Sequence, residues 1–198
     1  MNLFIIKMGD KHLKYGNVSE DKLENEIENA NNAFKKNLGY IPNIFSYPYG
    51  EYSLQIKELI KKKKFKAAFG QQSGIIFNEI DLFELPRFSM NEKYGDIDRV
   101  KFISQSKGMG VYDFIPSDPH IIENPPYIGF SLLDSHLAPK IDCFIFDKKG
   151  QVENEIFKFN ERIEIRLMRK LHKGRSRLNC TAKDNLDNWR WFGYQFYL

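Results

Sequence analysis

The hydrophobic pattern of this 198-residue chain changes once, near residue 108, and this change limits the folds open to it. Before that point apolar residues recur at helical spacing between short apolar runs. After it they alternate with polar residues in short segments. A helix places residues three and four apart on one face, whereas a strand places alternate residues on one face. The sequence therefore predicts an α/β domain over residues 1–107 and an antiparallel β domain over residues 108–198.

The first part has the order of elements that is typical of a parallel sheet. Residues 43–47 predict a short strand, Ser53 can begin a helix, and residues 66–70 are short, apolar and closed by glycine. Strand, helix and strand at this spacing form the unit of a parallel sheet or barrel. We therefore expect a partial (β/α) barrel.

Two further helices are expected in the first part. Residues 17–38 have apolar side chains at helical spacing, with Ser19 as a possible N-cap and Gly39 where a left-handed C-terminal cap belongs. Residues 96–106 show the same spacing over a shorter length.

The second part reads as a series of short strands separated by turn residues. Residues 162–168 show the clearest alternation of polar and apolar side chains. The other expected strands are residues 127–133, 141–146, 155–159, 177–181 and 189–197. Short strands at this spacing predict an antiparallel β-sandwich or a curled sheet.

The charge pattern argues against nucleic acid as a partner. The net charge is +4, from 30 basic and 26 acidic residues that are mixed along both parts of the chain. Lys61–Lys64 is a dense basic run, and a solvated helix end explains it without a partner.

The cysteines and the first residues bear on the compartment. Two cysteines, Cys143 and Cys180, are by default two buried thiols, although their places on separate strands allow a bridge in an exported protein. The apolar run Leu3–Ile6 is too short for a signal peptide or a membrane span. We therefore expect a soluble protein without a signal peptide, in a compartment that the residues do not reveal.

One segment carries a resemblance to a known family. Residues 45–52 read Phe-Ser-Tyr-Pro-Tyr-Gly-Glu-Tyr, between an expected strand and an expected helix. Taken alone, the Tyr-Pro-Tyr-Gly part is an ordinary turn. With its flanks it resembles the third motif of the NodB-type polysaccharide deacetylases, which reads Phe-Ala-Tyr-Pro-Tyr-Gly in one branch. The long helix before it and the later Leu85-Pro86-Arg87 are also similar to that family.

The resemblance implies a hydrolase that removes N- or O-acetyl groups from amino sugars. Family members use zinc or another divalent metal, held by two histidines and an aspartate, and a second aspartate as the base. By the resemblance, the backbone N–H of Tyr49 would stabilise the oxyanion, and Tyr47 would line the sugar groove. Pro48 and Gly50 would shape the bend at the substrate, and Arg87 would lie near the base.

The sequence also departs from the family. It contains no Asp-Asp pair, which is the family's first motif. His12 falls where the second metal histidine belongs, but Met8 occupies the place of the first, and a thioether is a poor ligand for a hydrolytic zinc. We therefore expect no metal and no activity in the isolated chain, with His12 as a remnant of the metal site.

Two explanations of these departures stay open. The chain is either the C-terminal part of a longer polysaccharide deacetylase or a remnant kept for binding or assembly, and a start at Met1 inside the second motif favours the first. In an isolated half barrel, the open edge beside Leu3–Ile6 would need a cover, for which a homodimer is one hypothesis.

The last expected strand offers a second place for a sugar. Trp189 and Trp191 share one face with Gln195, and aromatic rings with amide groups suit pyranose rings. The alternative is that this face is buried or forms a domain interface. Arg175 and Arg177 nearby either bind an acidic sugar or flank the turn.

The sequence thus predicts the C-terminal part of a polysaccharide deacetylase with a polysaccharide or oligosaccharide as partner. The alternative is a non-catalytic carbohydrate-binding or assembly module. A third interpretation is that the motif match is a coincidence.

Overall fold

The computed structural model describes residues 20–92 and 94–198, and these form two compact units. Unit 1 comprises the chain up to Gln71 together with Asp81–Leu85, and unit 2 comprises Gln72–Ile80 together with Pro86–Leu198. By packing, residues 86–107 therefore belong with the β-rich part, whereas the sequence grouped them with the α/β part. The division into domains 1–107 and 108–198 stays a prediction.

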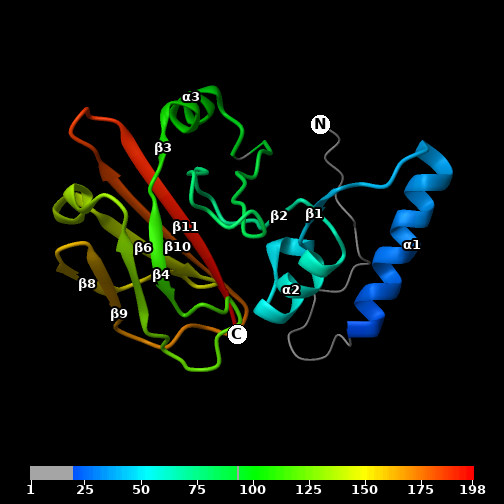
Figure 1. Ribbon diagram of the computed structural model, residues 1–198. Coiled ribbons are helices and arrows are strands. Elements are labelled where there is room, and N and C mark those ends of the chain that lie inside the picture. The colour runs from blue at the N-terminus through cyan, green and yellow to red at the C-terminus, as the bar shows by residue number, and fades with distance from the viewer. Residues whose placement is uncertain (1–19, 93) are drawn as a thin grey trace. The chain divides into compact units, whose positions relative to one another are not determined.

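Unit 1 contains the expected strand–helix–strand arrangement (Figure 1). Its elements are α1 (Glu20–Leu38), β1 (Ile44–Ser46), the short 3-10 helix η1 (Pro48–Gly50), α2 (Leu54–Lys62) and β2 (Ala67–Phe69). β1 and β2 pair in parallel, with Phe45 opposite Ala68. A partial barrel beyond these two strands stays a prediction.

Local signals in the sequence explain where these helices begin and end. Gly39 ends α1 at a φ of 80°, and its N–H donates to the Lys35 carbonyl at 3.1 Å. Ser53 caps α2, because its Oγ accepts a hydrogen bond from the N–H of Ile56 at 3.3 Å. The expected cap at Ser19 lies outside the described residues.

The described residues of unit 2 form one α-helix, one short 3-10 helix and two open sheets. α3 (Ile97–Gln105) begins at Asp96, whose side chain accepts from the N–H of Arg99 at 2.9 Å. The strands are β3 (Lys107–Gly108), β4 (Val111–Ile115), β5 (Ile128–Leu132), β6 (Asp142–Asp147), β7 (Gly150–Val152), β8 (Asn154–Phe159), β9 (Arg162–Leu167), β10 (Arg175–Lys183) and β11 (Trp189–Tyr197), with the short helix η2 (Ser135–Lys140) between β5 and β6.

The two sheets of unit 2 share one hydrophobic core. One sheet has the order β3-β11-β10-β6-β7 and the other the order β4-β5-β9-β8. Alternate residues of β6, β9 and β10 are buried, and the core joins Phe130 and Ile163 of one sheet to Ile145, Leu178 and Phe196 of the other. Neighbouring strands are antiparallel except for β3 and β11. The description of these sheets as a sandwich or a curled sheet stays a prediction.

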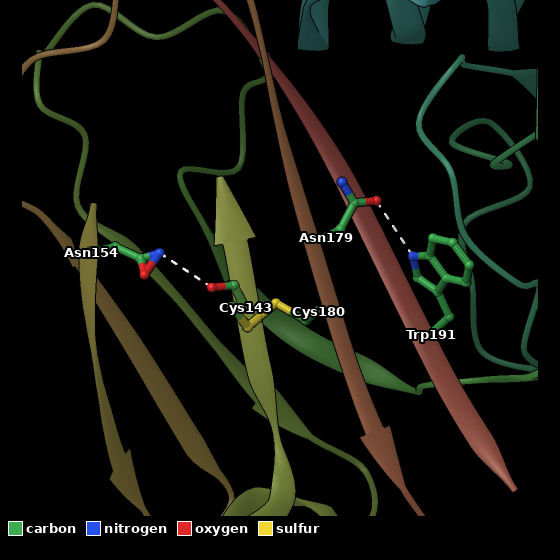
Figure 2. The surroundings of a disulfide bond; sticks show 5 residues. All are labelled: Cys143, Asn154, Asn179, Cys180 and Trp191. Atoms are coloured by element: carbon green, nitrogen blue, oxygen red, sulfur yellow. Dashed lines mark hydrogen bonds between the residues drawn. A yellow bond between two sulfur atoms is a disulfide. The ribbon is translucent and has the colours of Figure 1, made fainter. Parts of the chain in front are cut away.

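A disulfide joins two neighbouring strands of the larger sheet (Figure 2). Cys143 on β6 and Cys180 on β10 lie directly opposite each other, with their Cα atoms 4.1 Å apart. Both side chains are buried in the core. The expectation of two free thiols is therefore wrong, and the bridge lies within one sheet.

The outer face of β11 is covered by residues that precede the β-rich part. A Cβ at Gly193 would overlap the carbonyl of Ser73, so the backbone of the two segments can approach only because this residue is glycine. The ring of Phe88 lies 5.0 Å from that of Trp191. This packing explains why residues 72–80 and 86–107 form part of unit 2.

Candidate functional site

The bend after β1 has an unusual backbone. Tyr49 in η1 has a φ of 56° and a ψ of 10°, in the left-handed region, and its side chain is 37% exposed. The N–H of Gly50 donates to the Tyr47 carbonyl at 2.8 Å, and the N–H of Glu51 donates to the Pro48 carbonyl at 3.0 Å. These bonds hold Tyr49 at the tip of a tight turn at the carboxyl end of β1.

Two features require a glycine at position 50, namely the positive φ of its backbone and the lack of space for a side chain. Its φ is 73°, and a Cβ would overlap both the backbone nitrogen and the side chain of Gln71. The segment after β2 therefore passes directly against the bend and fixes its shape.

Tyr47 is a core residue of unit 1. Its side chain is fully buried, its ring stacks on that of Tyr52 at 4.5 Å, and its hydroxyl donates to the Phe83 carbonyl at 3.1 Å. Burial, followed by the charges of Glu84 and Asp81, raises the pKa of Tyr47 far above its ordinary value. Tyr47 therefore packs in the core beneath the Tyr47–Gly50 bend, and its side chain is not exposed to solvent.

A buried lysine, Lys57, joins helix α2 to the Asp81–Leu85 segment. Lys57 on α2 donates to Asp81 at 3.2 Å and also to Glu84, both in the Asp81–Leu85 segment that pairs with β2. Burial alone would lower the pKa of Lys57, but the hydrogen bond and charge of Glu84 raise it. Burial alone would raise the pKa of Asp81, but the N–H of Phe83 and the charge of Lys57 lower it. Both partners are therefore charged at neutral pH.

Comparison with protein families identifies this region. Residues 5–68 match the family model "Polysaccharide deacetylase". This part of the chain is related to the polysaccharide deacetylases. The match includes α1, β1, the Tyr47–Gly50 bend and α2, which are the segments that carried the resemblance in the sequence.

The other comparisons give weaker or no likeness. No curated protein matches the chain. Among solved structures, CopC from Methylosinus trichosporium OB3b is similar over 44% of this chain and 90% of its own, with 14% identity and a TM-score of 0.38. PcoC from Escherichia coli is similar over 44% of this chain and 96% of its own, with 13% identity and a TM-score of 0.37.

The predicted site residues of the deacetylase fall into both units. Tyr47, Pro48, Tyr49 and Gly50 lie together in unit 1, whereas Arg87 belongs to unit 2. Burial lowers the pKa of Arg87, and its N–H donates to the carbonyl of Gln72 at 3.0 Å.

The two predicted sugar-stacking tryptophans are partly covered within unit 2. The ring of Phe102 lies 6.0 Å from Trp189 and 6.1 Å from Trp191, and the indole N–H of Trp191 donates to Asn179 at 3.4 Å (Figure 2). Trp189 keeps 39% of its surface exposed. Trp191 is partly buried, and both the sugar-stacking role and the alternative of a second buried face stay predictions.

The described residues offer no site for the metal that a relation to the deacetylases implies. Over residues 20–92 and 94–198, no group of three or more His, Cys, Asp or Glu side chains is arranged to hold a metal ion. His12, the predicted remnant ligand, lies outside these residues, as does the edge beside Leu3–Ile6 on which the predicted homodimer depends.

The sequence did not predict the Lys57 network or a second polar cluster in unit 2. Lys57 precedes Ile60 by three residues on the buried face of α2, and a charged residue at that position was the available signal. In unit 2, the buried Asp147 accepts hydrogen bonds from Arg169 and His172, at 2.7 Å each. Neither partner is near Asp147 in sequence, so no local pattern could have shown this cluster.

Among the described helices, none is long and apolar enough to cross a bilayer.

Proposed function

We propose that unit 1 forms the oxyanion-stabilising side of a polysaccharide deacetylase centre, which in complete form hydrolyses acetyl groups of amino sugars. The observation that carries the proposal is the left-handed Tyr49 at the carboxyl end of β1, within the segment that matches the family. A bulky residue in this conformation costs about 1–2 kcal/mol, and such strain gathers at functional sites.

The chemistry needs a donor that points at the acetyl oxygen as negative charge develops there. We assign this role to the backbone N–H of Tyr49, which the turn holds at its tip. A backbone donor of this kind contributes roughly 3–4 kcal/mol to transition-state stabilisation. Pro48 and Gly50 shape the turn, Tyr47 supports it from the core, and Arg87 stays a proposed neighbour of the base.

The water-activating half of such a centre requires residues that this sequence does not contain. The family's Asp-Asp pair is missing, and with it the base. A metal would lower the pKa of a bound water from about 16 towards about 7, so without it the nucleophile is lost. We therefore expect the chain by itself to bind acetylated sugars without hydrolysing them.

We also propose that residues 108–198 form an accessory β domain that contributes to sugar binding. Trp189, with its exposed edge, stays a candidate sugar contact at residues 108–198. The alternative function is a non-catalytic carbohydrate-binding or assembly module, and a partner polysaccharide suits both functions.

Acetate release and sugar binding together test the proposal. We expect the purified chain to bind N-acetylated chitohexaose in calorimetry and to release no acetate with or without added zinc. Tyr49→Gly keeps the backbone N–H but frees the backbone to leave the left-handed conformation that holds this donor in place, so it should weaken binding at least fivefold. The unfolding free energy should change by less than about 1 kcal/mol, because relief of the left-handed strain offsets the added freedom of glycine. Tyr127→Gly, at an exposed tyrosine of unit 2, is the control.

Acetate release by the chain would contradict the assignment of the missing residues. Equal losses of binding in Tyr49→Gly and Tyr127→Gly would contradict the role of the bend.

A further inference from the structure

Unit 2 contains a pocket of about 380 Å³ that the Tyr47–Gly50 bend does not line. Its walls come from β3 and the residues after it, from the end of β5 and the start of η2, from the start of β11, and from residues 76–79. All of these segments belong to unit 2. Small-molecule sites are commonly clefts of about 300–1,000 Å³, so the pocket has the size of a ligand site.

One wall of the pocket is a turn that carries Glu79. The N–H of Ile80 donates to the Phe77 carbonyl at 3.3 Å, which closes this turn around Glu79. The turn follows a segment that lies directly against β3, because a Cβ at Gly108 would come within 2.8 Å of the Ile76 carbonyl oxygen. The wall that carries Glu79 is therefore held in place by the sheet.

A second carboxylate, Asp134, lines the pocket at the start of η2. Its Oδ1 accepts a hydrogen bond from the N–H of His136 at 3.1 Å, and Oδ2 accepts none from residues 20–92 and 94–198. Over the same residues, neither Glu79 nor Asp134 forms an ion pair, and both are exposed. Two carboxylates therefore line the pocket without a cation of their own.

Arg190 is the one cation among the described residues that line the pocket, and its charge is already balanced. Arg190 Nε and Nη2 lie 2.9 Å and 2.8 Å from Asp184 Oδ2, and Nη1 donates to the Gly108 carbonyl at 3.3 Å. Burial alone would raise the pKa of Asp184, but the N–H of Asn188 and the side chain of Arg190 lower it to about 2. Asp184 is therefore ionised at neutral pH. Because a guanidinium has five N–H groups, Arg190 keeps donors for a further oxygen.

The other cations near these segments do not offset the two carboxylates. Lys140, at the end of η2, donates to Asn185 at 3.0 Å. Lys107 precedes Gly108 on β3, so its side chain leaves the strand on the opposite face. Neither lysine lines the pocket, nor does His136. The lining residues therefore carry net negative charge.

We infer that this pocket binds an amino sugar with a free ammonium group, the product class of the proposed deacetylation. The ammonium is complementary to Glu79 and Asp134, and the sugar hydroxyls can accept from the remaining N–H groups of Arg190. The C–H groups of the ring can pack on Ile76 and Leu133, whose side chains are 52% and 50% exposed. The charge and lining come from the structure, whereas the choice of an amino sugar over another small amine rests on the proposed function.

Titration of the full chain with fully deacetylated chitobiose, followed by backbone amide chemical shifts at pH 7, tests this inference. We expect the largest changes at Gly108 and Gly110, which line the pocket, and an affinity that falls as NaCl is raised. Cellobiose and N,N′-diacetylchitobiose should bind there at least tenfold more weakly, because neither carries an ammonium group.

Two double variants show whether the carboxylates of the pocket are responsible. Glu79→Gln/Asp134→Asn should weaken binding at least tenfold, because both carboxylates are lost while asparagine can still cap η2. Glu123→Gln/Glu153→Gln removes the same charge at exposed positions outside the pocket and should leave the affinity unchanged. If the amide spectrum shows that the first variant does not fold, Glu79→Gln replaces it, with an expected loss of about threefold.

Four outcomes would overturn the inference. They are no changes at Gly108 and Gly110, equal binding of cellobiose, an equal loss in the Glu123/Glu153 variant, and equal binding of ethanolamine, which has the ammonium without the ring. N-acetylated chitohexaose lacks the free ammonium, so its binding at Tyr49 is a separate result and the two proposals can fail independently.

Discussion

Tyr49 and Gly50 together show how single residues shape the bend. Both have a positive φ, but only Gly50 is of a type that adopts it without strain. Other non-glycine residues with positive φ include Asp113, Asn160 and Asp187, whose short polar side chains tolerate this conformation. Tyr49 and Lys64, which has a φ of 62°, have no such side chain. Of these two residues, Tyr49 lies at the carboxyl end of a strand, where a functional role is expected.

Replacement of Gly50 tests how tightly the bend is built. Gly50→Ala should lower the unfolding free energy by about 2–3 kcal/mol, because the new Cβ would overlap Gln71 and the backbone would be strained. Gly39→Ala is the matched control, since its φ is also positive but no atom lies within 4 Å of the added Cβ. It should cost only about 1 kcal/mol. Equal losses in urea denaturation would show that Gln71 does not confine the bend.

Among the elements, α2 is tied to the Asp81–Leu85 segment by a buried charge cluster. Lys57 has a side-chain exposure of 10%, and its two carboxylate partners come from the segment that extends the sheet beside β2. This tie holds Phe83, whose carbonyl accepts the hydroxyl of Tyr47. The helix thus supports the bend through a segment that is distant in sequence.

This charge cluster predicts that replacement of Lys57 lowers the unfolding free energy by an amount that depends on pH. Lys57→Met should lower the unfolding free energy at pH 7 by about 2–3 kcal/mol, because Asp81 and Glu84 lose the buried cation that they share. The lowered pKa of Asp81 stabilises the fold above its ordinary value of 3.8, and this contribution is lost as the pH falls through the folded value. The raised pKa of Lys57 has its effect below 10.5, and this is lost as the pH rises through the folded value.

The difference between wild type and Lys57→Met should therefore shrink at pH 3. Lys61→Met is the control, because Lys61 also reaches Asp81, at 3.3 Å, but is 34% exposed and should cost less than about 1 kcal/mol. A loss that is the same at pH 3 and pH 7 would contradict the electrostatic origin of the tie.

The sequence predicted the elements with strong local patterns and missed those without. α1, α2 and α3 have caps and apolar spacing, and the strands β5, β6, β8, β9, β10 and β11 alternate or are continuously apolar. β4 was missed because Asp113 interrupts it in a left-handed conformation. β3 and β7 are two and three residues long, too short for any pattern.

At the scale of the whole molecule, contacts between residues far apart in sequence determine which segments belong to which unit, and the sequence pattern does not predict these contacts. Residues 72–80 join unit 2 because Ser73 lies against Gly193, and no local signal links two residues so far apart. The bend at Tyr47–Gly50 was predictable because its motif is contiguous. The Lys57 network was not, because its acidic partners follow 24 and 27 residues later.

The disulfide should account for much of the stability of unit 2. Cys143 and Cys180 are 37 residues apart, and a loop of this length implies a loss of about 3–4 kcal/mol when the bridge is removed. We expect dithiothreitol to shift the urea denaturation of the wild type accordingly. Cys143→Ala/Cys180→Ala should be destabilised and insensitive to the reductant. A wild type that does not respond would show that the bridge is absent in solution.

The central claim is that the Tyr49 bend faces an acetylated sugar. Its most direct test is the change in backbone amide chemical shifts on titration with N-acetylated chitohexaose, with the fully deacetylated hexamer as the control. We predict that the largest changes occur at Tyr49 and Gly50 and that the deacetylated sugar does not produce them. Changes confined to other residues, or the same changes with both sugars, would contradict the account.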